Sequence, residues 1–510
     1  SSEAFVTRIR TQGGIDSLIT SYGDVPRHNQ LPFYSRIPSA SALSVAPQTH
    51  ITRLGRFDLV SRIKTMNSNE LYSTAKKDAE IDNGKSIPSD SNNTTHFVFL
   101  VHGWLGNDLE MKYLESAIET SKKKYYSQPL NPNQERLVVH RTRNNNGHTK
   151  DGILEGATRL ANEIKDFILK DTAEQLNRDK DSNIHEKHVS ISFVGNSLGG
   201  LYARYAISLI PAELNIDNII PNTRVVIHSN VFCTTATPHL GTASHTYIAV
   251  PRIVEKGIGK LLSKTGKDLF RSDGNSDGDD LIYEMCTDYE QFLLPLSKFQ
   301  KRIAYANAFG TDFQVPTNTA AFLSEKSMHN HCPTDPSLFG KDDNEMKNGA
   351  EDSFIVAMVT TEQNNDILKE NGSKERKHYS LTMSNKMDAL GWTKVFIDVR
   401  GIIPGPRLNR PLAARQMTRR QIWSNFLQKK LSTSKTYDDI RVTSQDLARL
   451  MNGSETIGIP IGHQVMIANS KNKRYSDMTA NGKPVMDKLA NDLVHSILET
   501  EGKDSVPDQS

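Results

Sequence analysis

Short apolar runs alternate with helical patterns from residue 96 almost to the end of the chain. The runs with the length and apolar content of buried strands are residues 96–101, 136–140, 189–194, 230–235, 302–309 and 394–399. Apolar residues recur on one helical face at Ile153, Leu160, Ile164 and Ile168, and again at Met486, Leu489, Leu493 and Ile497. Strands that alternate with helices predict an α/β fold, a mainly parallel sheet with helices on both faces.

Two stretches interrupt this alternation. Residues from about 322 to 385 are polar and contain a single strand-like run, SFIVAMVTT. Residues from about 401 to 462 separate the last predicted strand from the last helix. We expect both stretches to be long insertions at loop positions of the sheet.

The chain before residue 96 follows another pattern. Residues 1–66 carry eight Lys or Arg but only four acidic residues, with many Ser, which is typical of targeting segments. An adapter packed on the main domain is the alternative that we favour. Residues 67–95 are polar without an apolar repeat, so we expect a linker there. We expect one large domain over residues 96–500 and a polar tail over residues 501–510.

Composition and charge exclude some functions. The 510 residues include 62 Lys and Arg against 59 Asp and Glu, a formal net charge of +3. This balance argues against nucleic-acid binding, which normally requires a strongly basic surface. No stretch approaches the roughly 18 apolar residues of a membrane-spanning helix. Three widely spaced cysteines, Cys233, Cys286 and Cys332, form no disulfide framework, so we expect a reducing, intracellular compartment.

A strand, a glycine-rich turn and a helix follow one another around Ser197. The predicted strand 189–194 leads into GNSLGG, residues 195–200, and a helical pattern follows. The pattern G-x-S-x-G in this context is typical of a nucleophile elbow, a strained turn that lifts a serine hydroxyl clear of the sheet. Gly195 and Gly199 fit because side chains there would collide with the neighbouring strand and helix. An ordinary turn whose serine caps the helix is the alternative.

A second turn, which follows the predicted strand 96–101, fits the same architecture. It begins with His102 and Gly103. The loop after this early strand contributes one backbone N–H to an oxyanion hole, and the residue after the nucleophile contributes the other. We therefore expect the amides of Trp104 and Leu198 to form that hole. We expect the His102 side chain to order its own loop rather than to contact substrate.

An acid is expected after a later strand of such a sheet, in the chain order Ser, Asp, His. Asp312 follows the predicted strand 302–309 and therefore lies at the carboxyl end of the sheet, where open α/β sheets place their sites. Asp398 is a rival, but it stands at the end of the last predicted strand. We therefore favour Asp312 as the acid.

The base is identified by elimination. Beyond the last predicted strand the chain contains only two histidines, His463 and His495. His495 lies inside the terminal amphipathic helix, whereas His463 occupies a loop ahead of it. We expect His463 to take the proton of Ser197, while Asp312 holds the imidazole through Nδ1–H.

Taken together, these segments resemble the eukaryotic serine esterase and lipase family of the α/β-hydrolase superfamily, which includes fungal lipid-droplet phospholipases. The likeness rests on HFVFLVHGWLGNDLEMKYL, DGILEGATRLANEI, VSISFVGNSLGGLYARYAI, CTTATPHLGT, RIAYANAFGTDFQVP and HQVMIANS…PVMDKLA. The resemblance implies an α/β-hydrolase fold and hydrolysis of carboxylic esters through an acyl-enzyme, with acyl chains of phospholipids or neutral lipids as substrates. It also implies that Ser197, Asp312 and His463 carry the reaction, and we expect no cofactor.

Two features depart from the family pattern. Asn196 precedes the nucleophile where His is the common residue, and we expect this to change the polarity near the elbow without abolishing catalysis. The long insertion before His463 is less usual and bears on substrate access.

Other functions stay open at this point. A catalytically weak relative that acts as a membrane-surface or scaffolding protein is the alternative from a different class. The intact order of Ser, Asp and His favours the hydrolase, because a scaffold has no need of it. Thioesterases and acyltransferases use the same triad and are further alternatives.

An acidic loop satisfies the spacing of an EF-hand calcium loop. Its candidate ligands are Asp273, Asn275, Asp277 and Glu284. However, Asp280 stands where an apolar residue normally secures such a loop, and no second hand is visible. A solvated acidic turn is the alternative that we favour, and we expect no metal site.

The second insertion contains a basic, amphipathic segment. Residues 400–435 carry nine Lys or Arg and no acidic residue. Within them Trp423, Phe426, Leu427 and Leu431 would share one helical face. Such a helix can lie in a membrane interface, with its cations near anionic head groups, which predicts peripheral binding to a membrane or lipid-droplet surface. Packing of this face on the protein, as a lid or a strut, is an equal alternative.

Overall fold

The computed structural model divides the chain between Gly84 and Lys85 into two units, and every residue that can be described belongs to the second. The described residues are 94–126, 136–179, 186–215, 223–243, 263–272, 280–309, 311–312, 314–334, 354–370, 379–399, 419–434, 436, 439–451 and 462–498. The expected N-terminal region, most of the linker and the polar tail therefore lie outside this description.

Within the described residues the strands form one ten-stranded sheet, in the order β10-β7-β8-β9-β6-β5-β3-β1-β2, with β4 paired to β5. The strands are β1 (Thr95–Val101), β2 (Arg136–Arg141), β3 (Glu186–Asn196), β4 (Glu213–Asn215), β5 (Arg224–Thr235), β6 (Lys301–Asn307), β7 (Asn330–Pro333), β8 (Ile355–Thr360), β9 (Thr393–Ile397) and β10 (Val442–Thr443). Along the order β9-β6-β5-β3-β1-β2 every pair is parallel, which confirms the predicted mainly parallel sheet, and the short β4 pairs antiparallel with β5.

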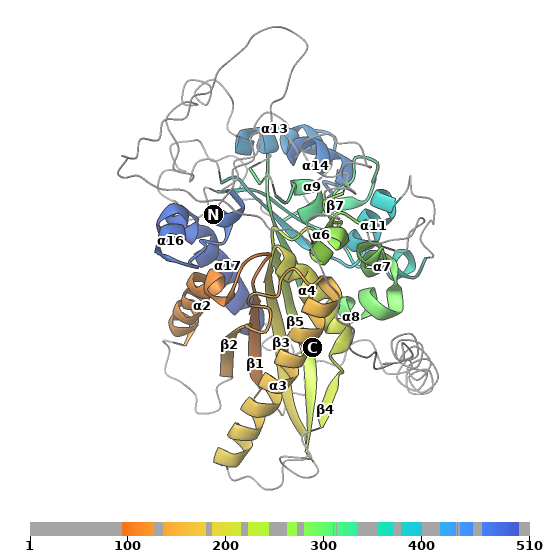
Figure 1. The fold of residues 1–510 in the computed structure, drawn as a ribbon. Coiled ribbons are helices and arrows are strands. Elements are labelled where there is room, and N and C mark those ends of the chain that lie inside the picture. Colours follow the sequence, from red (N-terminus) through yellow and green to blue (C-terminus); the bar gives the residue numbers. More distant parts are fainter. Residues whose placement is uncertain are drawn as a thin grey trace, which may run out of the picture. The chain divides into compact units, whose positions relative to one another are not determined.

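Helices connect the strands and cover the sheet (Figure 1). They are α2 (Lys112–Tyr125), α3 (Ile153–Asp179), α4 (Leu198–Ala206), α6 (Ser263–Leu269), α7 (Leu281–Thr287), α8 (Leu294–Ser297), α9 (Thr317–Ala320), α10 (Asn365–Lys369), α11 (Tyr379–Asp388), α13 (Arg419–Leu431), α14 (Ser444–Met451), α15 (Gly462–Met466), α16 (Lys473–Thr479) and α17 (Lys483–Leu498). Shorter helical turns are η1 (Asp108–Met111), η2 (Ile207–Leu209), η3 (Tyr289–Leu293) and η7 (Ala480–Gly482).

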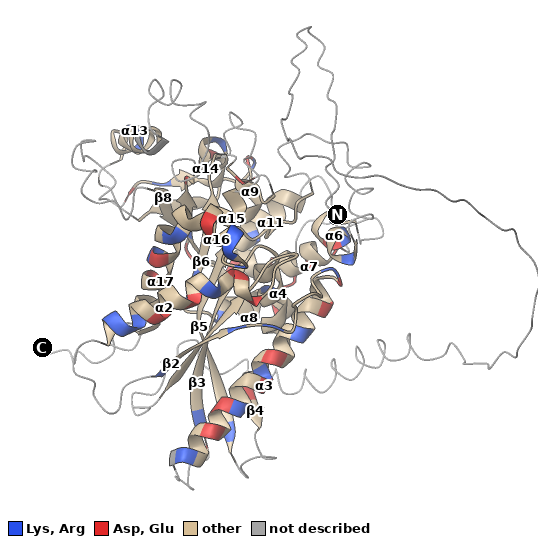
Figure 2. Ribbon diagram, turned by 60° about the vertical axis from the view of Figure 1, so that its left-hand side comes forward, with Lys and Arg blue, Asp and Glu red and all other residues tan. Residues whose placement is uncertain are grey.

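Two apolar cores lie on opposite faces of the sheet, because side chains alternate along each strand. In β1, Phe97 and Phe99 belong to the core under α3 and α4, whereas Val98 and Leu100 belong to the core under α2 and α17. The apolar stripes predicted for α3 and α17 are buried in these two cores, as expected from their spacing. The outer side of α3 carries acidic and basic residues in alternation (Figure 2). A parallel sheet with helices on both faces is the α/β-hydrolase architecture.

The start of α3 is determined by a distant residue. Asp151 stands just before this helix, but the Ile153 amide donates to Asp268 Oδ2 at 2.7 Å. Asp151 instead pairs with Arg159 at 3.1 Å. Asp268 lies at the end of α6, so the N-terminal amides of α3 are satisfied by tertiary contact rather than by a local cap.

The two predicted insertions contribute to the sheet. β8 pairs antiparallel with β9, β7 pairs with β8, and β10 pairs with β7. A fully buried ion pair joins Lys394 of β9 to Asp388 at 2.5 Å, and the Lys394 ammonium also donates to His331 of β7 at 2.9 Å. These contacts attach the first insertion to the main sheet, and its predicted strand-like run forms β8.

The amphipathic segment of the second insertion forms α13, and its face packs on the protein. Trp423 is 2% exposed and Leu427 is 1% exposed, and both belong to the core that contains β8. Leu431 at the end of the helix is exposed. The structure therefore follows the packing alternative for this helix. No helix among the described residues is long and apolar enough to cross a membrane.

Replacement of Trp423 by Ala is expected to lower the free energy of unfolding by about 3–5 kcal/mol, because it removes a large side chain from a closed core. Chemical denaturation of the purified protein measures this. Leu431→Ala on the same helix is the control and is expected to change the stability by less than about 0.5 kcal/mol. Equal, small effects of both substitutions would contradict the packed position of α13.

Candidate active site

Ser197 stands in a strained turn between β3 and α4. Its backbone has φ 54° and ψ −123°, a conformation that few residues other than glycine adopt. The turn lies tight against β1, because a Cβ added to Gly199 would come within 2.2 Å of the Val101 carbonyl oxygen. The Ser197 amide donates to the Thr235 carbonyl at 2.8 Å, which ties the turn to the end of β5. This is the geometry of a nucleophile elbow.

The loop after β1 lies directly against the elbow. A Cβ added to Gly103 would be 3.0 Å from Cβ of Ser197. His102 is buried, and its Nδ1 lies 3.1 Å from the Gly103 carbonyl oxygen within the same loop. The predicted motif residues His102 and Gly103, and Gly195 and Gly199 at the elbow, are therefore brought together around Ser197.

The amides in this loop differ in whether they have acceptors. The Leu105 amide donates to Thr149 Oγ1 at 3.0 Å, and the Gly106 amide donates to the Gly103 carbonyl at 3.1 Å. In the described part of the chain, no residue accepts a hydrogen bond from the Trp104 or the Leu198 amide. Unused donors that flank a nucleophile are suited to bind a developing oxyanion.

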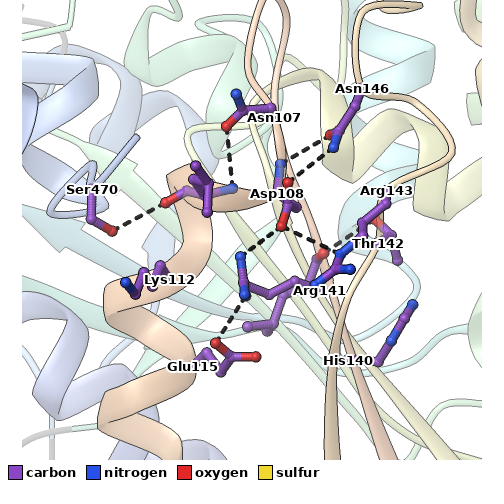
Figure 3. Close-up of polar contacts among 12 residues, drawn as sticks. Asn107, Asp108, Lys112, Glu115, His140, Arg141, Thr142, Arg143, Asn146 and Ser470 are labelled. Atoms are coloured by element: carbon purple, nitrogen blue, oxygen red, sulfur yellow. Dashed lines mark hydrogen bonds and ion pairs between the residues drawn. The ribbon is translucent and has the colours of Figure 1, made fainter. Parts of the chain in front are cut away.

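A network of charged residues holds the following turn, η1, in place (Figure 3). Arg141 of β2 donates to Asp108 Oδ2 at 2.7 Å and to Glu115 Oε2 at 2.8 Å. Asn146 donates to the other Asp108 oxygen at 2.9 Å and accepts from the Asp108 amide at 3.0 Å. On the other side, Ser470 Oγ donates to the Leu109 carbonyl. The loop that carries Trp104 is thus fixed at its far end.

Asp312 and His463 lie 151 residues apart in sequence but form a direct hydrogen bond. His463 Nδ1 donates to Asp312 Oδ2 at 2.7 Å. The same carboxylate accepts from Asn307 Nδ2 at 3.1 Å, from the Gln314 amide at 3.0 Å and from the Val315 amide at 2.9 Å. Four donors around one buried carboxylate fix its position beside the imidazole.

His463 lies in the short helix α15 rather than in a loop. A Cβ on Gly462 would come within 1.8 Å of the Thr311 carbonyl oxygen, so only glycine allows α15 to approach the Asp312 loop this closely. Burial lowers the pKa of His463, but the Asp312 carboxylate and, more weakly, Glu110 outweigh it and raise the pKa above its ordinary value. The described contacts include no hydrogen bond between the Ser197 hydroxyl and His463, a contact that often tightens only when substrate binds.

The described hydrogen bond to His463 comes from Asp312 and not from the rival acid, Asp398. The Asp398 amide donates to the Phe354 carbonyl at 2.9 Å, which places Asp398 beside the start of β8. Of the candidate calcium ligands, Asp273, Asn275 and Asp277 lie outside the described residues. Glu284 lies in α7, whose N-terminus is capped by Asp280. The described residues contain no group of three or more side chains suited to hold a metal ion.

Sequence reasoning missed two polar residues that support the site. Asn307 is the last residue of β6 and binds the Asp312 carboxylate. Glu110 is 4% exposed and accepts from the Gly103 amide at 3.3 Å and from Asn196 Nδ2. A signal for Glu110 was present, because two carboxylates, Asp108 and Glu110, closely follow the His-Gly turn. Its partners could be identified only from the fold.

Comparison with known proteins finds one family model and several yeast proteins that are similar to part of this chain. Residues 91–326 match the family model "Putative serine esterase (DUF676)". The chain is 31% identical over 237 residues to "Putative lipase YDL109C" of Saccharomyces cerevisiae. These residues are 46% of this chain and 31% of that protein. It is 29% identical over 233 residues to "Putative lipase ROG1" of the same yeast. These residues are 45% of this chain and 28% of that protein. The match thus spans less than a third of either relative.

A similar solved structure is the phospholipase PlaB from Legionella pneumophila in complex with thio-NAD, at 14% identity and a TM-score of 0.25, covering 46% of this chain and 42% of that one.

The family match and the yeast relatives confirm the resemblance read from the sequence. Since the matched segment runs from before β1 to beyond Asp312, it contains both the Ser197 elbow and the acid loop. Residues 91–326 of this chain are thus similar to the family described as "Putative serine esterase (DUF676)".

Proposed function

We propose that this protein is a serine hydrolase that cleaves carboxylic esters, with acyl esters of lipids as its substrates. The observation that supports this most directly is the buried hydrogen bond between His463 and Asp312, formed beside an elbow that carries Ser197. The description of the family and the lipase names of the yeast relatives support ester chemistry and a lipid substrate.

In the proposed reaction, the Ser197 hydroxyl oxygen attacks the ester carbonyl while His463 Nε2 removes the hydroxyl proton. The carbonyl oxygen becomes an oxyanion, which the Trp104 and Leu198 amides stabilise. His463 then returns the proton to the departing alcohol, and an acyl-enzyme remains on Ser197. A water molecule, activated in turn by His463, releases the fatty acid and restores the serine. Throughout, Asp312 holds Nδ1–H and stabilises the imidazolium.

A fluorophosphonate probe is expected to modify the protein at Ser197, because the probe reacts with a serine whose hydroxyl is activated by a histidine. Mass spectrometry of the labelled peptides identifies the site. The same preparation is expected to hydrolyse a short soluble ester and a long-chain acyl glycerolipid. The Ser197→Ala variant is expected to lose the labelling and both hydrolyses while it keeps its melting temperature.

Each outcome bears on a different part of the proposal. Labelling that persists in Ser197→Ala would show that the nucleophile is another residue. Hydrolysis of the short ester without any hydrolysis of the glycerolipid would retain the esterase and exclude the lipid substrate. Transfer of the acyl group to an added alcohol in preference to water would identify an acyltransferase.

A further inference from the structure

Glu110 is a buried carboxylate that lies between the two loops around Ser197. Its Oε1 accepts from the Gly103 amide in the loop after β1 and from Asn196 Nδ2 at the elbow. Its Oε2 lies under Gly106, where an added Cβ would come within 2.1 Å of it. A single carboxylate therefore connects the loop that carries Trp104 to the residue that precedes the nucleophile.

Asn196 has both of its side-chain polar groups engaged. Its Nδ2 donates to Glu110, and its Oδ1 accepts from Thr235 Oγ1 at 3.0 Å. This fixes the orientation of the amide, so that a neutral donor faces the carboxylate. Because an amide carries no charge, Asn196 orients Glu110 but does not neutralise it. The residue that departs from the family pattern is thus the direct partner of Glu110.

The two acidic neighbours of Glu110 each form an ion pair with a basic residue. Asp108 and Glu115 both form ion pairs with Arg141, at 2.7 and 2.8 Å. Within the described ranges, no Lys or Arg forms an ion pair with Glu110, although it is 4% exposed. A buried carboxylate that lacks a basic partner is uncommon, and such groups concentrate at functional sites.

The charge of Glu110 acts on His463. Burial lowers the pKa of His463, and the two groups that raise it are Asp312 and Glu110. The charged residues of α16, which packs on α15, are Lys473, Arg474 and Asp477, and their side chains are exposed. β6 also contacts α15. The charged residues of β6 lie at its start, at the opposite end of the strand from the Asp312 loop. Lys471, between α15 and α16, donates to the Leu105 carbonyl at 2.8 Å, and Asp312 and Glu110 are the two carboxylates that act on the imidazole.

We propose that Glu110 is a positioning residue that holds the oxyanion-hole loop against the nucleophile elbow and supplies a second negative charge to the His463 imidazolium. This inference rests on the proposed function for its effect on rate. When His463 takes the Ser197 proton, it becomes a cation in a buried site, where a carboxylate that is already in place stabilises it strongly. Asp312 does so by direct contact, and Glu110 does so across the elbow.

Glu110→Gln tests the charge separately from the shape. The glutamine Oε1 can still accept from the Gly103 and Asn196 donors, so the two loops stay connected. We expect kcat to fall about tenfold, as for the loss of a charged partner. Only neutral His463 acts as a base, so kcat/KM falls as the pH drops through its pKa. Without Glu110 that pKa is lower, and the acid limb of the profile moves to lower pH.

Two further variants and a control make the result specific. Glu110→Asp restores the charge and is expected to return the acid limb toward its position in the unmodified enzyme. Asn196→His places a cation beside Glu110 at low pH and is expected to move the limb in the same direction as Glu110→Gln. Glu115→Gln removes a carboxylate that is paired with Arg141 and is expected to leave the limb in place. A fall in kcat and melting temperature with an unmoved limb in Glu110→Gln would overturn the inference.

A titration that needs no turnover separates this inference from the proposed function. Imidazole NMR signals of the Ser197→Ala protein, assigned by their loss in His463→Gln, report the ionisation of His463 directly. Adding Glu110→Gln is expected to move that titration to lower pH. If the protein hydrolyses no ester, the proposed function fails while this shift still supports the role of Glu110. If the titration is unchanged, the inference fails whatever the activity.

Discussion

Replacement of His463 by Ala is expected to lower kcat for ester hydrolysis by about 10⁶-fold, close to the effect of removing the nucleophile itself. The reason is that the Ser197 hydroxyl is a poor nucleophile without a base, and the site contains one imidazole hydrogen-bonded to a buried carboxylate. The rate is to be measured with a short soluble ester, and labelling by a fluorophosphonate is expected to fall in parallel.

His495→Ala is the matched control for this experiment. His495 is the other histidine beyond β9, and it is exposed on α17. Its replacement is expected to leave kcat within about twofold of the unmodified enzyme, since surface substitutions rarely have larger effects. A large loss in His495→Ala, with activity retained in His463→Ala, would show that the base had been assigned to the wrong histidine.

Replacement of Asp312 by Asn is expected to lower kcat about 10⁴-fold, with little change in the fold. The asparagine oxygen can keep the hydrogen bonds from the Gln314 and Val315 amides, so the loop is retained. However, a neutral amide no longer stabilises the imidazolium, and its NH₂ group can hold the wrong tautomer of His463. The pKa of His463, which Asp312 raises, is expected to fall, so that the remaining activity extends to lower pH.

Asp398→Asn distinguishes the two candidate acids. Asp398 follows β9, and its amide binds the Phe354 carbonyl at 2.9 Å, whereas the described bond to His463 comes from Asp312. We expect Asp398→Asn to retain most of the activity. If this variant is inactive and Asp312→Asn is active, the observed hydrogen bond does not serve catalysis.

The repeating pattern of the chain was sufficient to predict the architecture. Phe97 and Phe99 alternate with Val98 and Leu100, and the structure places the two pairs in different cores. The predicted apolar stripe of α3 is likewise buried in one core. Its residues are Ile153, Leu160, Ile164 and Ile168. These features follow from local periodicity, so they can be derived before any contact is known.

The strand pairing near the edge of the sheet and the helix caps could not be derived from local periodicity. β8 reads as a buried strand, but nothing in its sequence indicates that it runs antiparallel to β9 or that His331 would meet Lys394. Likewise, the amide of Ile153 finds its acceptor in Asp268, 115 residues further along the chain. Such pairings depend on which distant segments the fold brings together, and a single sequence does not contain that information.

The sequence by itself determined the α/β sheet, the elbow at Ser197 and the short list of candidate acids and bases, because each depends on residue type and local spacing. Only the tertiary structure decided that Asp312 rather than Asp398 meets His463, and that Asn196 faces Glu110. The physical reason is that hydrogen bonds act over about 3 Å, a distance that sequence separation does not predict. The electrostatic environment of the site is therefore a property of the folded chain.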